Sequence, residues 1–445
     1  MNMLFNLCYF IIEKFYMVKE ITLKSLEDDL KAKNYLDVIK GSKALLEKGG
    51  NSLECEILLA SALVQSEEFI EGGQVFLDIT KKYKQFPSTV YYNLSSAYLG
   101  QNRFKDALFN ARQYVNQNST NIMGYLRLGE LYTKLFLPGE RKMSYFMALG
   151  LDPENHAALR GLSECFRTEQ DSEGALRYLS KQKKTPRRDM NMLEAHYFLG
   201  NKLLFNNKLL ELNKEEVLIP LVACLSAHAS IRFSQKDNYQ FCPNPFNYIQ
   251  HLSLGEGELN KSFIQEVIST IERYNFSYTP QNLLINGTQT LGPGNIFNLK
   301  DDCIVTLKTL VESKIKEYRD SYKTEDIGFF KRWPNSEDYD LQGWVIDLKA
   351  GGSLKRHIHK EGWLSGSLYL SIPDKEKLNE GDIVFSLDGN SYPTDGKFYT
   401  ERVVGLNTGD MVLFPSSIFH STIPFSAKES RITLAFDIIP KYMKD

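Results

Sequence analysis

The stretch that decides the fold of the C-terminal half is "LKRHIHKEGWLSGSLYLSIP", residues 354–373. Two histidines, His357 and His359, stand two residues apart, just ahead of a run that alternates with a period of two. That period is typical of a β-strand, in which side chains at positions i and i+2 point to the same side of the sheet. The stretch therefore predicts a strand with two imidazoles near one end, able to converge on one metal ion.

Further short strands are expected around this one. Apolar runs bounded by glycine, proline or asparagine lie at 343–352, 364–373, 381–387, 410–415 and 431–440. Ahead of them, residues 260–274 and 301–322 show the three- and four-residue apolar spacing of amphipathic helices, and the segment 286–297 between them reads as a turn-rich loop. Helices followed by a late antiparallel sheet or barrel predict an α + β domain.

A second group of polar residues lies farther along the chain. His420 follows the expected strand Met411–Phe414, where Pro415 ends the strand and the chain turns. In a jelly roll, strands distant in sequence lie side by side, so His420 can join the first two histidines. Arg431 opens the last strand with Thr433 on the same face, which brings a cation with five donors and a hydroxyl near the same place. An arginine so placed indicates a carboxylate ligand, although each histidine could also be an ordinary core or water-facing residue.

The first half of the chain repeats itself. The segments "LSSAY" (94–98), "LGELY" (128–132) and "LSECF" (162–166) share one pattern in a constant 34-residue register, and "ASALV" at 60–64 is a weaker copy. A fixed period of this size is typical of a solenoid of helix–turn–helix units. The small residue in each motif lets two antiparallel helices approach, and the aromatic residue fills the space between them. The pattern resembles the tetratricopeptide repeat, which implies a groove for a protein or peptide partner.

Composition narrows the function classes. With 53 basic and 55 acidic residues the formal net charge is −2, so no overall field attracts nucleic acid or anionic lipid. The six cysteines lack metal-ribbon spacing and read as core residues of a reduced, cytoplasmic protein. The apolar residues 1–16 are too short to span a membrane and predict an extension ahead of an alternative start at Met17, or a small docking helix.

The expected domain organisation follows from these patterns. It consists of an N-terminal extension at 1–16, tetratricopeptide repeats at 17–182, a helical connector at 183–240 and a C-terminal domain at 241–445. The last boundary is placed where prolines, aromatics and asparagines become frequent. The expected fold class is thus multidomain α + β, an all-α solenoid followed by a double-stranded β-helix (jelly roll) with supporting helices.

The motifs of the C-terminal domain resemble a known family. The combination of HIH with a following WLSG and tyrosine, of phenylalanine-proline-serine before the distal histidine, and of the later arginine is similar to a bacterial 2-oxoglutarate/Fe(II) oxygenase family that often carries tetratricopeptide repeats. The resemblance covers about residues 240–445 and is strongest after Trp344. It implies a hydroxylase that uses Fe(II), 2-oxoglutarate and O2, with an unknown substrate that is a candidate protein or peptide.

Carried over residue by residue, the resemblance gives three iron ligands, His357, His359 and His420. His359 occupies the position where many relatives have an aspartate, so the third ligand is either His359 or Glu361, which forms an HxE pair with it. The three-histidine set is favoured because HIH belongs to the family pattern. For the 2-oxoglutarate carboxylate the resemblance implies Arg431 and Thr433, with Ser365 and Tyr369 as further candidates, and Trp363 and Phe419 are expected to wall the pocket.

Two other function classes fit parts of the sequence. One is a repeat-containing scaffold whose cupin-like domain is catalytically silent, and such a protein binds neither iron nor 2-oxoglutarate. The other is a zinc cupin with a different activity, such as a sugar isomerase, which does not need an arginine at position 431. The oxygenase is the favoured prediction because it accounts for the histidines and the arginine together.

Overall fold

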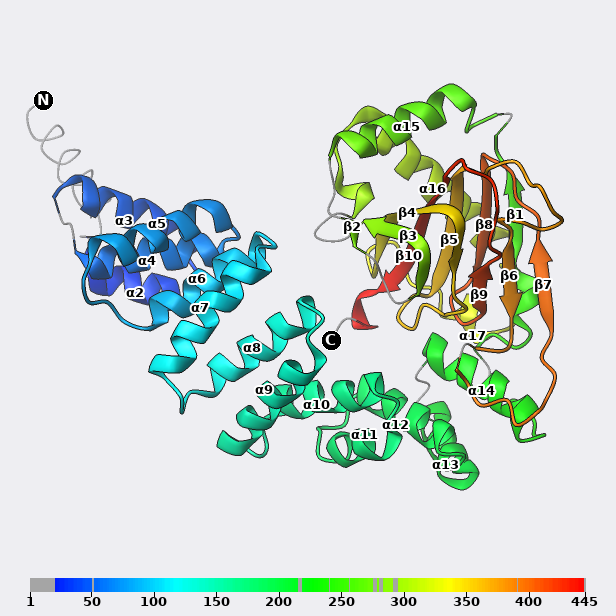
Figure 1. The fold of residues 1–445 in the computed structure, drawn as a ribbon, viewed down its shortest axis with the longest axis horizontal. Helices are drawn as coiled ribbons and strands as arrows, with labels where there is room; N and C mark the ends of the chain where they lie inside the picture. The colour runs from blue at the N-terminus through cyan, green and yellow to red at the C-terminus, as the bar shows by residue number, and fades with distance from the viewer. Residues whose placement is uncertain are drawn as a thin grey trace, which may run out of the picture. The chain divides into compact units, whose positions relative to one another are not determined.

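The computed structural model describes residues 21–49, 52–214, 218–239, 241–255, 257–274, 278–279, 283–290, 295–389 and 391–443 (Figure 1). The chain divides after Glu169 into two compact units, which we consider separately. The predicted N-terminal extension, residues 1–16, lies outside the described residues. Among the described helices, none has the length and apolar character needed to cross a membrane.

The first unit is built from successive antiparallel helices. They are α2 (Leu23–Lys31), α3 (Tyr35–Glu47), α4 (Leu53–Gln65), α5 (Phe69–Lys82), α6 (Thr89–Gly100), α7 (Phe104–Gln117), α8 (Ile122–Lys134), α9 (Pro138–Leu151) and α10 (His156–Thr168). Each helix packs on the next, and α4, α6, α8 and α10 carry the four copies of the repeat motif. The predicted helical solenoid is confirmed.

The small and aromatic positions of the motif do the packing expected of them. Tyr98 and Tyr132 are buried, and Gly129 of α8 faces the ring of Tyr145 on α9. A methyl group added at Gly129 would come within 2.6 Å of that ring, so the close approach of the two helices depends on a residue without a side chain. Helices begin at side-chain caps such as Asn121 and Asn155, whose side chains accept backbone N–H groups of the first turn.

The second unit begins with helices and ends with strands. Its helical elements are α11 (Ser172–Leu179), α12 (Pro186–Phe198), α13 (Lys202–Lys214), α14 (Pro220–Arg232), η1 (Pro245–Tyr248), α15 (Lys261–Arg273), η2 (Ile296–Asn298), α16 (Asp302–Ser321), α17 (Gly328–Lys331) and η3 (Lys441–Met443). Proline at the first helical position starts both α12 and α14, where its missing N–H costs no hydrogen bond. The two amphipathic helices predicted from the sequence are α15 and α16.

The strands form two antiparallel sheets. They are β1 (Gln250–Ser253), β2 (Tyr278–Thr279), β3 (Leu284–Thr290), β4 (Tyr339–Leu354), β5 (Leu364–Ser371), β6 (Ile383–Ser386), β7 (Glu401–Val404), β8 (Asp410–Pro415), β9 (Phe419–Thr422) and β10 (Arg431–Pro440). The larger sheet has the order β1-β8-β5-β10-β4-β3-β2 and the smaller one β7-β6-β9. The chain just after β4 returns to the small sheet through a bridge between His357 and His420. This alternation between two sheets is that of a jelly roll, and the predicted fold class is confirmed.

The strands predicted at 343–352, 364–373, 381–387, 410–415 and 431–440 correspond to β4, β5, β6, β8 and β10. The segment 286–297 was expected to be a loop, but its first part belongs to β3, which pairs with β4. Asn286 in β3 has a positive φ of 46°, beside a shift of register, so the strand is formed by its partner despite turn-type residues. The short strands β1, β7 and β9 were not predicted either.

One large core joins the helices and the larger sheet. Helices α15 and α16 pack on one face of the larger sheet. Val267 of α15 and Val311 of α16 belong to the same buried cluster as Val345 of β4 and Phe436 of β10. Tyr197 of α12 belongs to the same cluster. The segment 183–240, predicted to be a connector, thus contributes to the core of the second unit. The boundaries predicted at 182 and 240 stay predictions.

Candidate metal centre and its cavity

Three histidines meet where the ends of the two sheets come together. His357 and His359 lie in the segment after β4, and His420 lies on β9, whose backbone bridges that of His357. One ring nitrogen from each of the three lies within 4.8 Å of the other two. The Nε2 atoms of His357 and His359 are 3.2 Å apart. The structure therefore brings together the two halves of the candidate site that lie far apart in the sequence.

The opposite ring nitrogens are all occupied by acceptors. The Nδ1 atom of His357 lies 2.8 Å from the carbonyl of Lys355, and that of His420 lies 3.3 Å from the carbonyl of Ile418. Carbonyls only accept, so these Nδ1 atoms carry the single proton of a neutral imidazole. Their Nε2 lone pairs are then free to bind a cation, and one ring nitrogen of each lies within 4.8 Å of one on the other. This donor set suits a divalent transition metal.

Burial keeps His357 and His420 neutral. It lowers the pKa of His357 to about 4, with a further contribution from the neighbouring imidazole of His359. Burial also lowers the pKa of His420 well below its ordinary value. Neutral imidazole is the form that binds a metal, so the surroundings prepare these side chains as ligands at neutral pH.

A carboxylate that the sequence reasoning missed lies behind His359. Asp437 on β10 places Oδ1 2.6 Å from His359 Nδ1, and the hydroxyl of Ser365 donates to the same oxygen at 2.7 Å. The signal was present in "RITLAFD", because an acidic residue at position 437 falls on the inward face of an apolar strand, in phase with Arg431 and Thr433.

Glu361, the alternative third ligand, points elsewhere. Its carboxylate pairs with Arg187 of α12 at 3.2 Å, and 40% of its side chain is exposed. Within the part of the chain that the structure describes, the metal-ligating cluster comprises the three histidines alone. The geometry thus favours His359 over Glu361.

A cavity of about 230 Å³ opens beside the histidines, between the two sheets. Arg431, Thr433 and Tyr369 line it together with apolar side chains such as Ile346. The guanidinium of Arg431 is buried, donates to the hydroxyl of Thr433 at 2.7 Å and to the carbonyl of Gly381 at 2.9 Å, and lies over the ring of Tyr369. None of the described carboxylates forms an ion pair with it, and Asp382, the carboxylate that influences its pKa, pairs with Lys375 instead.

Tyr369 adds a second unsatisfied group to this cavity. Its hydroxyl is buried and makes no hydrogen bond of ordinary length and angle among the described residues, although Ser367 and Arg431 lie close enough to interact with it. Burial raises its pKa to about 12, so it stays a neutral donor. A buried cation without an acid and a buried hydroxyl without an acceptor are both costly unless an anion binds between them. The cavity is therefore suited to a carboxylate.

The other residues singled out from the sequence lie outside the cavity. Ser365 is bonded to Asp437 and Ser416, and it supports His359 instead of facing the cavity. Trp363 is fully buried against Phe241 and Phe329, and Phe419 packs on Tyr392. The expectation that Trp363 and Phe419 wall the pocket was wrong. Neither ring lines the cavity, because each packs against aromatic side chains of other segments.

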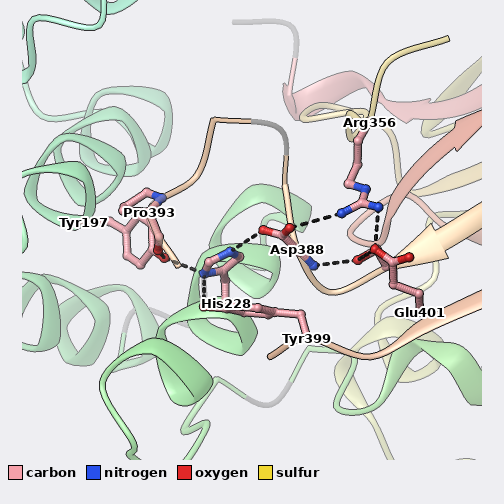
Figure 2. A network of polar contacts seen from close by, with 8 residues as sticks. Tyr197, His228, Arg356, Asp388, Pro393, Tyr399 and Glu401 are labelled. Atoms are coloured by element: carbon pink, nitrogen blue, oxygen red, sulfur yellow. Dashed lines mark hydrogen bonds and ion pairs between the residues drawn. The ribbon is translucent and has the colours of Figure 1, made fainter. Parts of the chain in front are cut away.

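A chain of polar contacts that starts in α14 holds the segment 355–361, which carries His357 and His359 and is called the ligand loop below (Figure 2). His228 of α14, fully buried, contacts the hydroxyls of Tyr197 and Tyr399 through Nδ1, and its Nε2 lies 3.5 Å from Asp388. Asp388 binds Arg356 at 3.1 Å, and Arg356 directly precedes the candidate ligand His357. Helix α12 contributes as well, since Glu194 binds Lys360 at 2.7 Å. These helices position the ligand loop.

A much larger cleft adjoins the cavity. It measures about 1160 Å³ and runs between α16, η2 and the first half of β4. Gln289 and Trp344 line both the cleft and the cavity, so the two spaces meet at these side chains. The cleft is mostly polar, with the amides of Asn295, Asn298 and Gln342 and charged residues of α16. It offers room for a substrate far larger than the cavity can hold.

Comparison with known proteins agrees with this geometry in the C-terminal region. Residues 342–437 match the model of a family described as "Putative 2OG-Fe(II) oxygenase". The match begins in β4 and ends at Asp437, and it includes the three histidines and Arg431.

The helical region has relatives of its own. The heat shock protein STI1 of Saccharomyces cerevisiae is 38% identical over 81 residues, a match that spans 18% of this chain and 14% of the relative. Among solved structures, PilF of Pseudomonas aeruginosa is similar with 13% identity and a TM-score of 0.38, covering 43% of this chain and 89% of that one. MamA of Desulfovibrio magneticus has 18% identity and a TM-score of 0.34, covering 36% and 89%. The chain thus combines N-terminal helical repeats with a C-terminal domain that matches the 2OG-Fe(II) oxygenase family model.

Proposed function

We propose that the C-terminal domain is a non-haem dioxygenase that couples oxidative decarboxylation of 2-oxoglutarate to hydroxylation of a substrate. The observation that carries this proposal is the meeting, in one cavity, of three imidazoles with an arginine that forms no ion pair with a carboxylate among the described residues. The family match over residues 342–437 supports it. Iron(II), when bound, supplies a redox centre at which O2 converts 2-oxoglutarate to succinate and CO2 while one oxygen atom goes to the substrate.

The proposed ligands are His357, His359 and His420. Their Nδ1 atoms are held by Lys355, Asp437 and Ile418, which fixes each ring with Nε2 toward the common centre. Because three protein ligands leave positions free on a six-coordinate metal, this set is compatible with a bidentate cosubstrate and O2. The exposed position of Glu361 supports the three-histidine set.

The proposed binding group for the distal carboxylate of 2-oxoglutarate is Arg431. Its charge and donors suit a carboxylate, and the orphaned hydroxyl of Tyr369 beside it would gain an acceptor. Thr433 fixes the guanidinium through its own hydrogen bond and is a positioning residue in this proposal. We do not extend the cosubstrate role to Ser365, whose hydroxyl is engaged with Asp437 and Ser416.

The proposed substrate is a polar group of a larger molecule, with a protein or peptide as the leading class. The cosubstrate would take up a large part of the usable space in the cavity of about 230 Å³ beside the metal, whereas the adjoining cleft of about 1160 Å³ is open and polar. Trp344, whose ring lies 5.6 Å from that of His359, and Gln289 stand where the two spaces meet. A reacting group would pass these two side chains to reach the metal.

The helical repeats are proposed to recruit a protein or peptide partner, as solenoids with a concave face commonly do. We also propose that residues 183–240 belong functionally to the oxygenase, because α12 and α14 hold the ligand loop through Glu194 and His228. A cytoplasmic location is proposed from the five described cysteines, all free and buried.

The direct test is formation of succinate from 2-oxoglutarate by the purified full-length chain with Fe(II) and O2, without added substrate. The wild type is expected to turn over slowly, and His420→Ala is expected to lose this turnover. Arg431→Ala should raise the 2-oxoglutarate concentration that gives half-maximal turnover by about 30-fold or more, because it removes the buried positive charge that binds the carboxylate. Arg402→Ala, an arginine outside the cavity, is the matched control. Equal, background turnover in wild type and His420→Ala would contradict the proposal.

A further inference from the structure

We propose that Asp437 is a positioning residue that supplies, through His359, the carboxylate that a three-histidine site lacks in its first coordination sphere. This inference rests on the proposed function, and it explains how a histidine can stand where an aspartate is common. The usual facial triad has two histidines and one carboxylate. Here the carboxylate lies one imidazole ring away from the candidate metal position, bonded to the far nitrogen of His359 at 2.6 Å.

The hydrogen bond determines the state of the ligand. An ionised carboxylate only accepts, so the proton of His359 must lie on Nδ1 and the lone pair on Nε2. Nε2 is the atom that faces His357 at 3.2 Å, toward the common centre. A carboxylate on Nδ1 also makes the imidazole a stronger electron donor at Nε2, as in the carboxylate–histidine pairs of zinc sites. His359 backed by Asp437 therefore carries part of the negative charge that a directly bound aspartate would bring.

Apart from His359, which carries a charge only when protonated, the described residues place no cationic side chain in an ion pair with Asp437. Its side chain is 8% exposed. A buried carboxylate without a cation is unfavourable. A divalent ion bound to His359 would provide the compensating charge across the ring, which is a second reason to read this aspartate as part of the metal site.

The carboxylate is also held in a fixed orientation. The hydroxyl of Ser365 donates to Oδ1 at 2.7 Å and lies 2.8 Å from the hydroxyl of Ser416. Gly362 allows this arrangement, because a Cβ there would come within 2.7 Å of Ser416 Oγ and 3.2 Å of Asp437 Cγ. The loop that carries His359 can thus approach β10 closely enough for the imidazole to reach the carboxylate.

The test measures Co(II) binding to the full-length chain by absorption titration, in a double-mutant cycle. Asp437→Asn is expected to weaken Co(II) binding by about 10- to 100-fold, the usual effect of losing such a partner. In a His359→Asp background, which restores a directly bound carboxylate, the same Asp437→Asn change is expected to cause no weakening. Asp410→Asn is the matched control. Asp410 is also a buried aspartate bonded to a histidine, His251, with 2.8 Å between Oδ2 and Nε2, but it does not line the cavity.

The outcomes separate this inference from the proposed function. Equal Co(II) affinity in wild type and Asp437→Asn, or the same loss in both backgrounds, would overturn the positioning role and leave the proposed function intact. Failure of the wild type to bind Co(II) would overturn the proposed function as well. If the Asp437 variants do not fold, nitrogen NMR of the metal-free wild type decides: a His359 proton on Nδ1 supports the inference, and one on Nε2 contradicts it.

Discussion

At the scale of single residues, the buried histidines of this domain fall into two groups, candidate metal ligands and a histidine that only connects neighbouring segments. His357 and His420 line the cavity, each with its Nδ1 held by a backbone carbonyl, whereas His228 is enclosed by the hydroxyls of Tyr197 and Tyr399. All three are kept neutral by burial. The first two are available to a metal, and the third connects α14 to the loop that holds Arg356.

The buried His228 predicts a pH dependence of stability. Burial lowers its pKa to about 4 in the folded chain, against about 6.5 when unfolded. Between these values the unfolded state binds more protons, so the free energy of unfolding falls as the pH falls through this window. The contribution lost between pH 7 and pH 5 is about 2 kcal/mol. Urea unfolding at both pH values, followed by tryptophan fluorescence, measures it in the second unit, where all three tryptophans lie.

A variant separates His228 from the other titrating groups. His228→Asn cannot gain a proton, so its loss of stability between pH 7 and pH 5 should be smaller than that of the wild type by about the same 2 kcal/mol. An identical pH dependence in the two proteins would show that His228 already titrates normally in the folded state.

The residues of the site differ in how visible they are in the sequence. His357, His359 and His420 could be identified because histidines are few and because HIH and the distal histidine fall near strand ends. Asp437 could not be assigned, since its role depends on the pairing of β10 with β5 and on the path of the loop before Trp363. The orphaned hydroxyl of Tyr369 is likewise visible only when its neighbours are known.

At the scale of elements, the central strands of the larger sheet set the geometry of the site. β10 pairs with β4 on one side and with β5 on the other, which places Arg431 and Asp437 at opposite ends of one inward-facing row. The positions that we propose for the cosubstrate and the metal are thus separated along a single strand. The order of these strands, rather than their individual sequences, determines that separation.

The packing of β5 against β10 predicts a specific weakness at Gly366. This residue is paired with Phe436, and a Cβ there would come within 2.2 Å of the Phe436 ring and 2.9 Å of Leu413. Gly366→Ala should therefore lower the free energy of unfolding by about 1–3 kcal/mol through overpacking. Urea unfolding measures the loss. Gly257→Ala, where a Cβ meets nothing within 4 Å, is the control, and an unchanged midpoint for Gly366→Ala would contradict the packing described.

Sequence patterns predicted the elements unevenly. The apolar runs that became β5, β8 and β10 are long enough to show a period or a buried core. In contrast, β7 and β9 are four residues each and are formed by pairing with β6 on either side. A short strand of this kind depends on its neighbours for hydrogen bonds, so a local pattern is insufficient to predict it.

At the scale of the whole molecule, the chain forms two compact units that differ in how far apart in the sequence their contacting residues lie. The first is repetitive, and its 34-residue period was readable because each unit repeats the same local contacts. The second depends on contacts between distant segments, such as those of His228 with Asp388 and of His357 with His420. This is why the fold class could be predicted, while the role of α12 and α14 in holding the ligand loop could not.

We propose that three histidines hold Fe(II) beside an arginine that binds 2-oxoglutarate. Anaerobic addition of Fe(II) and 2-oxoglutarate to the full-length chain tests it through the metal-to-ligand absorption band of the ternary complex. The band should form in the wild type and in Glu361→Ala, and it should be lost in His357→Ala, His359→Ala and His420→Ala. A wild type without the band, or a band that survives His359→Ala and disappears in Glu361→Ala, would contradict the claim.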